Sequence, residues 1–301
     1  MDAWPLSPWR SSVLPVATRV AQNGGRIPIG RPTAAAFSAV PGPAESRFHF
    51  TQPGTDGTAM DYRYADLAKM IDHSLLNPTL TGDDLESGIT LALAYDVASV
   101  CIMPYYLRRC AERLRGSDVR ASTTIGFPHG GQVTAVKRAE AERALEDGGQ
   151  ELDLVVNISK VLSDDWDYVR DDLAAVIEVT HAAGQRVKVI FENCYLQDRH
   201  KIRLCEICTE LGADWVKTST GYGTGGATHD DLRLMRRHSG PAVRVKAAGG
   251  VRDLDALIAV RELGVSRCGA SRTRPMLDEC RRRLGLPPIE VSVDVAADGG
   301  Y

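Results

Sequence analysis

Three charged residues interrupt segments of the sequence that are otherwise apolar and rich in β-branched residues. Asp153 lies in Leu-Asp-Leu-Val-Val-Asn, Lys217 in Asp-Trp-Val-Lys-Thr, and Lys246 in Val-Arg-Val-Lys-Ala-Ala. A charge in a buried strand is costly unless it is paired or functional, and lysine is rarely buried without a partner. Two such lysines and one such carboxylate are therefore candidates for chemistry.

The chemistry open to a buried lysine is attack on a carbonyl group to form a Schiff base. The amine attacks only when it is neutral, and its reference pKa of about 10.4 leaves almost none neutral at pH 7. Burial and a second ammonium group both lower that pKa, so Lys246 beside Lys217 would activate it. A carboxylate such as Asp153 can move protons during carbon–carbon cleavage. The competing interpretation is that both lysines only form ion pairs, with Asp153 and Glu192, inside a core.

The elements that must position these residues alternate between short apolar segments and longer amphipathic ones. The pattern predicts strands near 71–73, 99–103, 120–125, 152–157, 187–192, 215–218, 243–247 and 266–269. It predicts helices at 135–147, 166–183, 198–211, 230–237 and 254–263, several of them followed by glycine. Eight strands alternating with helices over about 215 residues favour the α/β class and a (β/α)8 TIM barrel. The rival is a doubly wound open sheet, which is disfavoured because no Gly-x-Gly-x-x-Gly turn follows the first strand.

Loops after the late strands form a second group of candidates, because barrel chemistry lies at the carboxyl ends of the strands. Thr220 and Gly221 follow the sixth predicted strand, Gly249 and Gly250 follow the seventh, and Ser271 follows the eighth. Glycine lets backbone amides approach a phosphate closely, and loops after strands seven and eight commonly bind one. Ordinary turns are the alternative, and the placement after consecutive late strands favours a phosphate site.

The two ends of the chain differ from its middle. Residues 1–60 are rich in Pro, Gly, Ala and Ser, which predicts a low-complexity, disordered extension; a transit peptide, or a start at Met60, are the alternatives. The barrel is expected at 61–285 and a C-terminal tail at 286–301. A net charge of −3 and the lack of a long apolar segment argue against a nucleic-acid or membrane partner. Seven scattered cysteines suit a reducing, cytoplasmic location.

Six segments, in order along residues 64–284, resemble the deoxyribose-phosphate aldolase family. They are IDHSLLNP (71–78), ASVCIMP (98–104), TTIGFPHG (123–130), ELDLVVNIS (151–159), DWVKTSTGYGTGGAT (214–228) and VKAAGGVRDLDAL (245–257). The resemblance implies a class I aldolase that cleaves 2-deoxy-D-ribose 5-phosphate reversibly to D-glyceraldehyde 3-phosphate and acetaldehyde. It implies a sugar phosphate as the small-molecule partner, no metal and no cofactor, and by analogy a homodimer.

The resemblance also implies roles for single residues. Lys217 aligns with the Schiff-base lysine, Lys246 with the second lysine that perturbs it, and Asp153 with the proton-shuttling aspartate. Asp72 aligns with a further, supporting aspartate. Cys101 aligns with a cysteine near the aldehyde, while Gly221, Gly249, Gly250 and Ser271 align with the phosphate site. Thr220 joins these candidates through its place after the sixth strand.

Two residues depart from the family pattern at the phosphate end. Ala248 stands where a serine is usual and so removes a hydroxyl group, and Arg272 stands where a second small or hydroxyl residue is common. Two rival functions therefore stay open. One is a related Schiff-base aldolase with a different aldehyde or phosphorylated substrate. The other is a barrel that binds a sugar phosphate without catalysis, and it predicts no reactive lysine.

Overall fold

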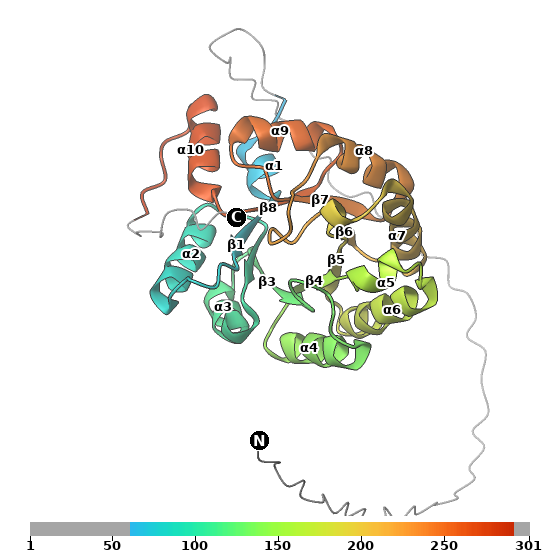
Figure 1. Ribbon diagram of the computed structural model, residues 1–301. Coiled ribbons are helices and arrows are strands. Elements are labelled where there is room, and N and C mark those ends of the chain that lie inside the picture. The colour runs from blue at the N-terminus through green and yellow to red at the C-terminus, as the bar shows by residue number, and fades with distance from the viewer. Residues whose placement is uncertain (1–60, 292–301) are drawn as a thin grey trace, which may run out of the picture. The chain divides into compact units, whose positions relative to one another are not determined.

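A closed barrel of eight parallel strands forms the centre of the computed structural model, which describes residues 61–291. Figure 1 shows the strands as an inner ring with the helices arranged around it. The strands are ordered from β1 to β8, and β8 closes the barrel by pairing with β1. The predicted (β/α)8 barrel is confirmed and the open-sheet rival is wrong. The extension predicted at 1–60 and most of the predicted tail lie outside the described residues.

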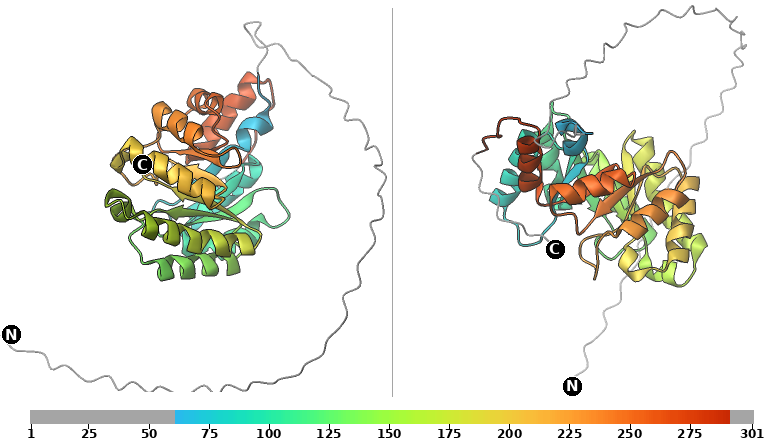
Figure 2. Two further views of the ribbon diagram at one scale, coloured as in Figure 1. Left: turned by 90° about the vertical axis from the view of Figure 1, so that its right-hand side faces the viewer. Right: turned by 90° about the horizontal axis from the view of Figure 1, so that it is seen from above.

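The eight strands and the five predicted helices lie close to their predicted positions, and the described residues form further helices besides. The strands are β1 (Ile71–Leu75), β2 (Ser99–Ile102), β3 (Arg120–Ile125), β4 (Glu151–Val155), β5 (Arg186–Ile190), β6 (Trp215–Lys217), β7 (Arg244–Ala248) and β8 (Arg267–Ala270). The helices are α1 (Tyr64–Ala68), α2 (Gly82–Ala94), α3 (Leu107–Leu114), α4 (Thr134–Glu146), α5 (Ile158–Leu162), α6 (Trp166–Ala182), α7 (Asp198–Glu210), α8 (His229–His238), α9 (Leu254–Glu262) and α10 (Thr273–Arg283). Figure 2 shows from two further sides how the helices cover the strands.

Local signals in the sequence fix where the helices begin and end. Thr81, Thr228 and Asp253 accept backbone hydrogen bonds at the starts of α2, α8 and α9. Glycines with positive φ follow the ends of α4, α6, α7 and α9: Gly148, Gly184, Gly212 and Gly264. A left-handed glycine is a common helix stop, because it has no Cβ to clash. The chain is thereby turned back toward the next strand at the amino-terminal side of the barrel.

Successive residues of each strand point alternately to the helices and to the barrel interior. Those that face the helices are apolar and fully buried, as Leu154, Val189 and Val245 are. On β4 and β5, the residues that face the barrel interior carry charges instead, as Asp153 and Lys188 do. Barrel interiors are more often filled with Val, Ile and Leu. The apolar layer between strands and helices is therefore the main core, and the interior is left to charged side chains.

Strand register decides whether the two candidate lysines meet. Lys217 of β6 pairs with Lys246 of β7, so both side chains point to the same side of the sheet. Asp153 of β4 pairs with Lys188 of β5 in the same way. A slip of one residue would send a strand's whole inward set toward the helices. The observed register therefore places both lysines inside the barrel.

Candidate active site

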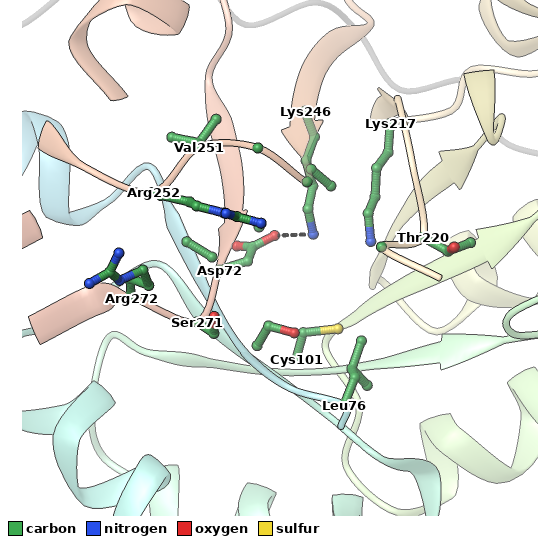
Figure 3. A pocket seen from close by; sticks show the side chains of 17 residues that line it. Asp72, Leu76, Cys101, Lys217, Thr220, Lys246, Val251, Arg252, Ser271 and Arg272 are labelled. Atoms are coloured by element: carbon green, nitrogen blue, oxygen red, sulfur yellow. Dashed lines mark ion pairs between the residues drawn. The ribbon is translucent and has the colours of Figure 1, made fainter. Parts of the chain in front are cut away.

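The interior side chains gather around the carboxylate of Asp153. Its Oδ2 accepts hydrogen bonds from Nζ of Lys217 at 2.7 Å and from Nζ of Lys246 at 2.8 Å. Its Oδ1 accepts one from Nζ of Lys188 at 2.9 Å. Lys246 also pairs with Asp72 at 2.6 Å, an ion pair that Figure 3 marks beside the end of the Lys217 side chain. One buried carboxylate thus holds three lysine amines together.

A second group of charges lies toward the amino-terminal ends of the strands. Arg267 donates to both carboxylate oxygens of Glu151, at 2.9 Å each, and also to Asp72. Lys188 lies 2.7 Å from Glu151, and the hydroxyl of Ser99 donates to Asp72 at 2.7 Å. These side chains are buried, so their charges act on one another with little screening by solvent. The two groups form one network through Asp72 and Lys188.

Sequence reasoning missed three members of this network. Lys188 carried the same signal as Lys217, a charge inside the apolar segment Val-Lys-Val-Ile, and could have been found from it. Glu151 and Arg267 begin their strands, where a charged side chain usually meets solvent. Their burial depends on how the barrel closes at its amino-terminal end, so no local signal in the sequence reveals it.

The network acts differently on the two candidate lysines. Burial lowers the pKa of Lys217, and the charge of Lys246 lowers it further against the pull of Asp153. Burial also opposes the charge of Lys246, but Asp153 and Asp72 outweigh it and raise the pKa of Lys246. For Asp153 itself, burial is outweighed by the cations Lys188, Lys217 and Lys246, and its pKa is lowered. Lys217 is therefore the lysine of this network that most readily loses its proton.

A pocket opens over the lysines at the carboxyl ends of the strands (Figure 3). Lys217, Lys246 and Asp72 line it, and Asp153 holds the two amines from within the barrel. Every other site residue predicted from the sequence also lines it: Cys101, Thr220, Gly221, Gly249, Gly250 and Ser271. The ion-pair interpretation is thus incomplete, because the lysines form their ion pairs and also border a space that a ligand can enter.

One part of the pocket wall is suited to an anion. Gly249 has a φ of 76°, a left-handed conformation that favours glycine. A Cβ at this position would lie 2.9 Å from the Cα of Gly226, so the close approach of the two backbones also requires glycine. Ser271 and Arg272 immediately precede α10, whose N-terminus carries partial positive charge. Arg252 and Arg272 line the same pocket (Figure 3). Amides, a helix end and two cations together can hold a phosphate group.

Glu192 fixes the loop that follows β6. Its carboxylate accepts a hydrogen bond from the backbone N–H of Thr220 at 3.2 Å and another from the Thr220 hydroxyl. Glu192 has a φ of 58°, a left-handed conformation that is uncommon outside glycine and is often found at functional sites. The ion-pair interpretation named Glu192 as a partner of the two lysines, whereas the structure joins it to Thr220. Its carboxylate therefore shapes the pocket wall.

Three loops are tied together around the pocket mouth. The hydroxyl of Tyr222, after β6, donates to the backbone carbonyl of Leu76, after β1, at 2.6 Å. The Tyr222 ring packs edge-on against Phe127, after β3, with ring centroids 5.3 Å apart. Leu76 is itself part of the pocket wall. These contacts join the three loops and restrict how far they can separate.

Comparison with a family model covers all eight strands of the barrel. The family model described as DeoC/LacD family aldolase matches residues 66–271. The curated deoxyribose-phosphate aldolase of Rhodopirellula baltica is 72% identical over 241 residues, which cover 80% of this chain and 99% of that protein. The one from Thermococcus gammatolerans is 47% identical over 208 residues, covering 68% of this chain and 92% of that protein. The solved deoxyribose phosphate aldolase of Aeropyrum pernix, described as a unique tetramer, is 29% identical with a TM-score of 0.68, covering 73% of this chain and 92% of that one.

Proposed function

We propose that this chain, which belongs to the DeoC/LacD family of aldolases, is a class I deoxyribose-phosphate aldolase. It cleaves 2-deoxy-D-ribose 5-phosphate reversibly to D-glyceraldehyde 3-phosphate and acetaldehyde through a Schiff base on Lys217. The observation that carries the proposal is the meeting of Lys217 and Lys246 on one oxygen of Asp153, beside a pocket whose wall is suited to an anion. A barrel that only bound sugar phosphates would need the wall but not the paired amines.

The first half of the reaction forms the Schiff base. The neutral Nζ of Lys217 adds to the C1 carbonyl of the open-chain sugar and gives a carbinolamine. Lys246, which Asp72 and Asp153 keep protonated, donates a proton to the carbinolamine hydroxyl, and water leaves. Asp153 takes up and returns protons between the two amines because both bond to its Oδ2. The product is an iminium ion on Lys217.

The second half breaks the bond between C2 and C3. The C3 hydroxyl loses its proton to the Asp153–Lys246 pair, through a water molecule, and the bonding electrons move into the iminium ion to give an enamine. D-glyceraldehyde 3-phosphate leaves. Protonation of the enamine at C2 and hydrolysis of the resulting iminium ion then release acetaldehyde and restore Lys217. In this scheme Cys101 and Thr220 border the reacting end, and Gly221, Gly249, Gly250 and Ser271 bind the phosphate.

A second candidate function is a related Schiff-base aldolase with a different phosphorylated substrate. Ala248 and Arg272, which depart from the family pattern, both line the pocket. Ala248 offers no hydroxyl to the ligand, while Arg272 adds a guanidinium group at the start of α10. The chemistry at Lys217 would be the same, and only the group held at the anion-binding wall would differ.

Trapping of the Schiff base tests both candidates. The protein is incubated with acetaldehyde, reduced with borohydride and digested, and the peptide that carries the ethyl group is identified by mass spectrometry. We expect the adduct on Lys217 and none in Lys217→Met. An unmodified Lys217 would refute the aldolase function and favour a binding barrel. An adduct without turnover of deoxyribose 5-phosphate would favour the second candidate.

We also propose that the protein is a cytoplasmic homodimer. The seven cysteines are all free, which supports a reducing compartment. Within residues 61–291, no helix combines the length and the apolar character needed to cross a bilayer. Light scattering of the full chain should give the mass of two copies. The mass of four copies would instead match the assembly described for the Aeropyrum pernix enzyme.

A further inference from the structure

The ion-pair network inside the barrel contains an odd number of charged side chains. The cations are Lys188, Lys217, Lys246 and Arg267, and the carboxylates are Asp72, Glu151 and Asp153. If all of them were ionised, this network would carry one uncompensated positive charge, which is costly away from water; the buried carboxylate of Glu192 bonds to Thr220 and lies outside the network. Loss of one proton from a lysine leaves three cations opposite three carboxylates. The composition of the interior therefore favours one neutral lysine.

We propose that the opposite charges of Glu151 and Arg267 set the pH at which Lys217 becomes this neutral lysine: Arg267 lowers that pH and Glu151 raises it. The inference rests on the proposed Schiff-base function and assigns that function two further positioning residues. Among the described residues, neither of the two lines the substrate pocket. They act through the network and do not touch the reacting atoms.

The contacts favour one distribution of the remaining protons. Lys188 contacts Glu151 at 2.7 Å, Asp153 at 2.9 Å and Asp72 at 3.4 Å. Lys246 contacts Asp72 and Asp153, whereas Lys217 contacts Asp153 alone. Lys217 thus has the fewest negative charges to hold its proton. In agreement, the carboxylates outweigh burial and raise the pKa of Lys188 and Lys246, while burial lowers that of Lys217.

Arg267 is a fourth cation that pairs with the carboxylates in addition to the three lysines. Its guanidinium group occupies both oxygens of Glu151 and one oxygen of Asp72. Arginine stays protonated at any working pH, so this positive charge is permanent. If Arg267 were absent, the three lysines would stand opposite three carboxylates, and Lys217 would keep its proton. The arginine therefore supplies the cation that lets Lys217 become neutral.

Other charged groups face the network from its edges. Arg120 lies 3.8 Å from Glu151 with its side chain 38% exposed, and Arg186 pairs with Glu151 in register. Arg244 stacks on the Trp215 ring beside Arg267, with its guanidinium carbon 3.4 Å from the ring centroid. These three arginines are partly solvated, so their effect is screened. At the mouth, burial raises the pKa of the Cys101 thiol and keeps it neutral. None of these groups changes in the test that follows.

The test is the pH at which acetaldehyde is half-maximally trapped on Lys217 by borohydride. In Arg267→Met the trapping midpoint should rise by about one pH unit. The loss of the guanidinium charge acts on Lys217 through the intervening network, where the effective dielectric constant is about 20. In Glu151→Gln, which removes a negative charge and keeps the shape, it should fall by a similar amount. The double variant restores the charge balance and should return the midpoint to its original value. Arg267→Lys keeps the charge and should leave it unmoved.

Opposite shifts separate this role from a structural one. A merely structural pair would lower the trapping rate at every pH without moving the midpoints apart, and that result would overturn the inference. Because Arg267→Met removes a buried partner and can prevent folding, Glu151→Gln must by itself lower the midpoint for the inference to stand. The exposed pair of Arg138 and Glu142 on α4, 2.9 Å apart, provides matched controls, Arg138→Met and Glu142→Gln. Absence of any adduct in the unaltered protein would refute the proposed function itself, whereas adducts with unmoved midpoints would refute this inference alone.

Discussion

Replacing Lys246 by methionine removes the cation that shares Asp153 with Lys217. Both amines bond to the same Oδ2, Lys217 at 2.7 Å and Lys246 at 2.8 Å. Two unit charges about 5 Å apart, at an effective dielectric constant of about 20, repel by about 3 kcal/mol, which corresponds to about two pKa units. The oxygen released by Lys246 also attracts the proton of Lys217 more strongly. Both effects raise the pKa of Lys217.

The direction of the resulting pH dependence follows from the sign of this change. Burial first, and the charge of Lys246 second, lower the pKa of Lys217, so the amine is neutral at a lower pH than an ordinary lysine. Lys246→Met removes the second cause and leaves the first. At pH 7 the neutral fraction of Lys217 should fall about 100-fold, and it should recover as the pH is raised by about two units. The variant should therefore be most defective at low pH.

Borohydride trapping of acetaldehyde as a function of pH measures this shift. Lys201→Met is the matched control: Lys201 is also a buried lysine with two aspartates, Asp198 at 3.2 Å and Asp231 at 2.6 Å, but it lies on α7 outside the barrel. Its pH profile should match that of the unaltered protein. A Lys246→Met profile with an unshifted midpoint would show that Lys246 does not control the protonation of Lys217, and would refute the electrostatic reasoning.

Three further changes test other parts of the molecule. Gly249→Ala puts a Cβ into a backbone of φ 76° and should lower the Tm by about 2–10 °C; it should also raise the KM for the sugar phosphate more than that for acetaldehyde, and equal changes would contradict a phosphate role. Lys137→Met leaves the buried carboxylate of Asp172, 2.5 Å away, without its cation. Urea titration should show a loss of about 3–5 kcal/mol in unfolding free energy. The trapping midpoint of Lys217 should stay unchanged, and a shift would contradict a purely structural role for this pair. Tyr222→Phe removes the 2.6 Å hydrogen bond to Leu76 and should raise KM up to about fivefold at unchanged kcat, so an unchanged KM would show that this bond does not shape the mouth.

The barrel could be predicted because its strands, and the helices α4, α6, α7, α8 and α9, leave local signals. Apolar, β-branched segments of strand length alternate with amphipathic ones, and glycines such as Gly184 and Gly212 follow the helices where left-handed stops are found. Strand register leaves no such signal. That Lys217 stands opposite Lys246 depends on the pairing of β6 with β7, which is decided by how the whole sheet closes. From the sequence alone, Lys217 and Lys246 could be predicted to meet only if the two strands pair in this register.

The candidate site divides in a similar way. Asp153, Lys217 and Lys246 stood out because a charge within an apolar strand is unusual, and the structure places both lysines within hydrogen-bond distance of Asp153. Glu151 and Arg267 did not stand out, because at the start of a strand the same charge is ordinary. Only closure of the barrel removes them from water. Reasoning from single segments therefore finds the groups that face the substrate more readily than the groups that set their charge.

The charged side chains around Asp153 all belong to strands, whereas most of the pocket wall that we propose to bind the phosphate belongs to the loops after β6, β7 and β8. Reactivity and recognition are thus encoded in different parts of the chain and can change independently. Insertions or substitutions in the loops can alter which acceptor aldehyde fits without retuning the nucleophile. Libraries restricted to the loops after β7 and β8 should keep acetaldehyde trapping while their acceptor range diverges. A barrel divided in this way can acquire new substrates through single substitutions in its loops, because those substitutions leave the protonation of Lys217 unaltered.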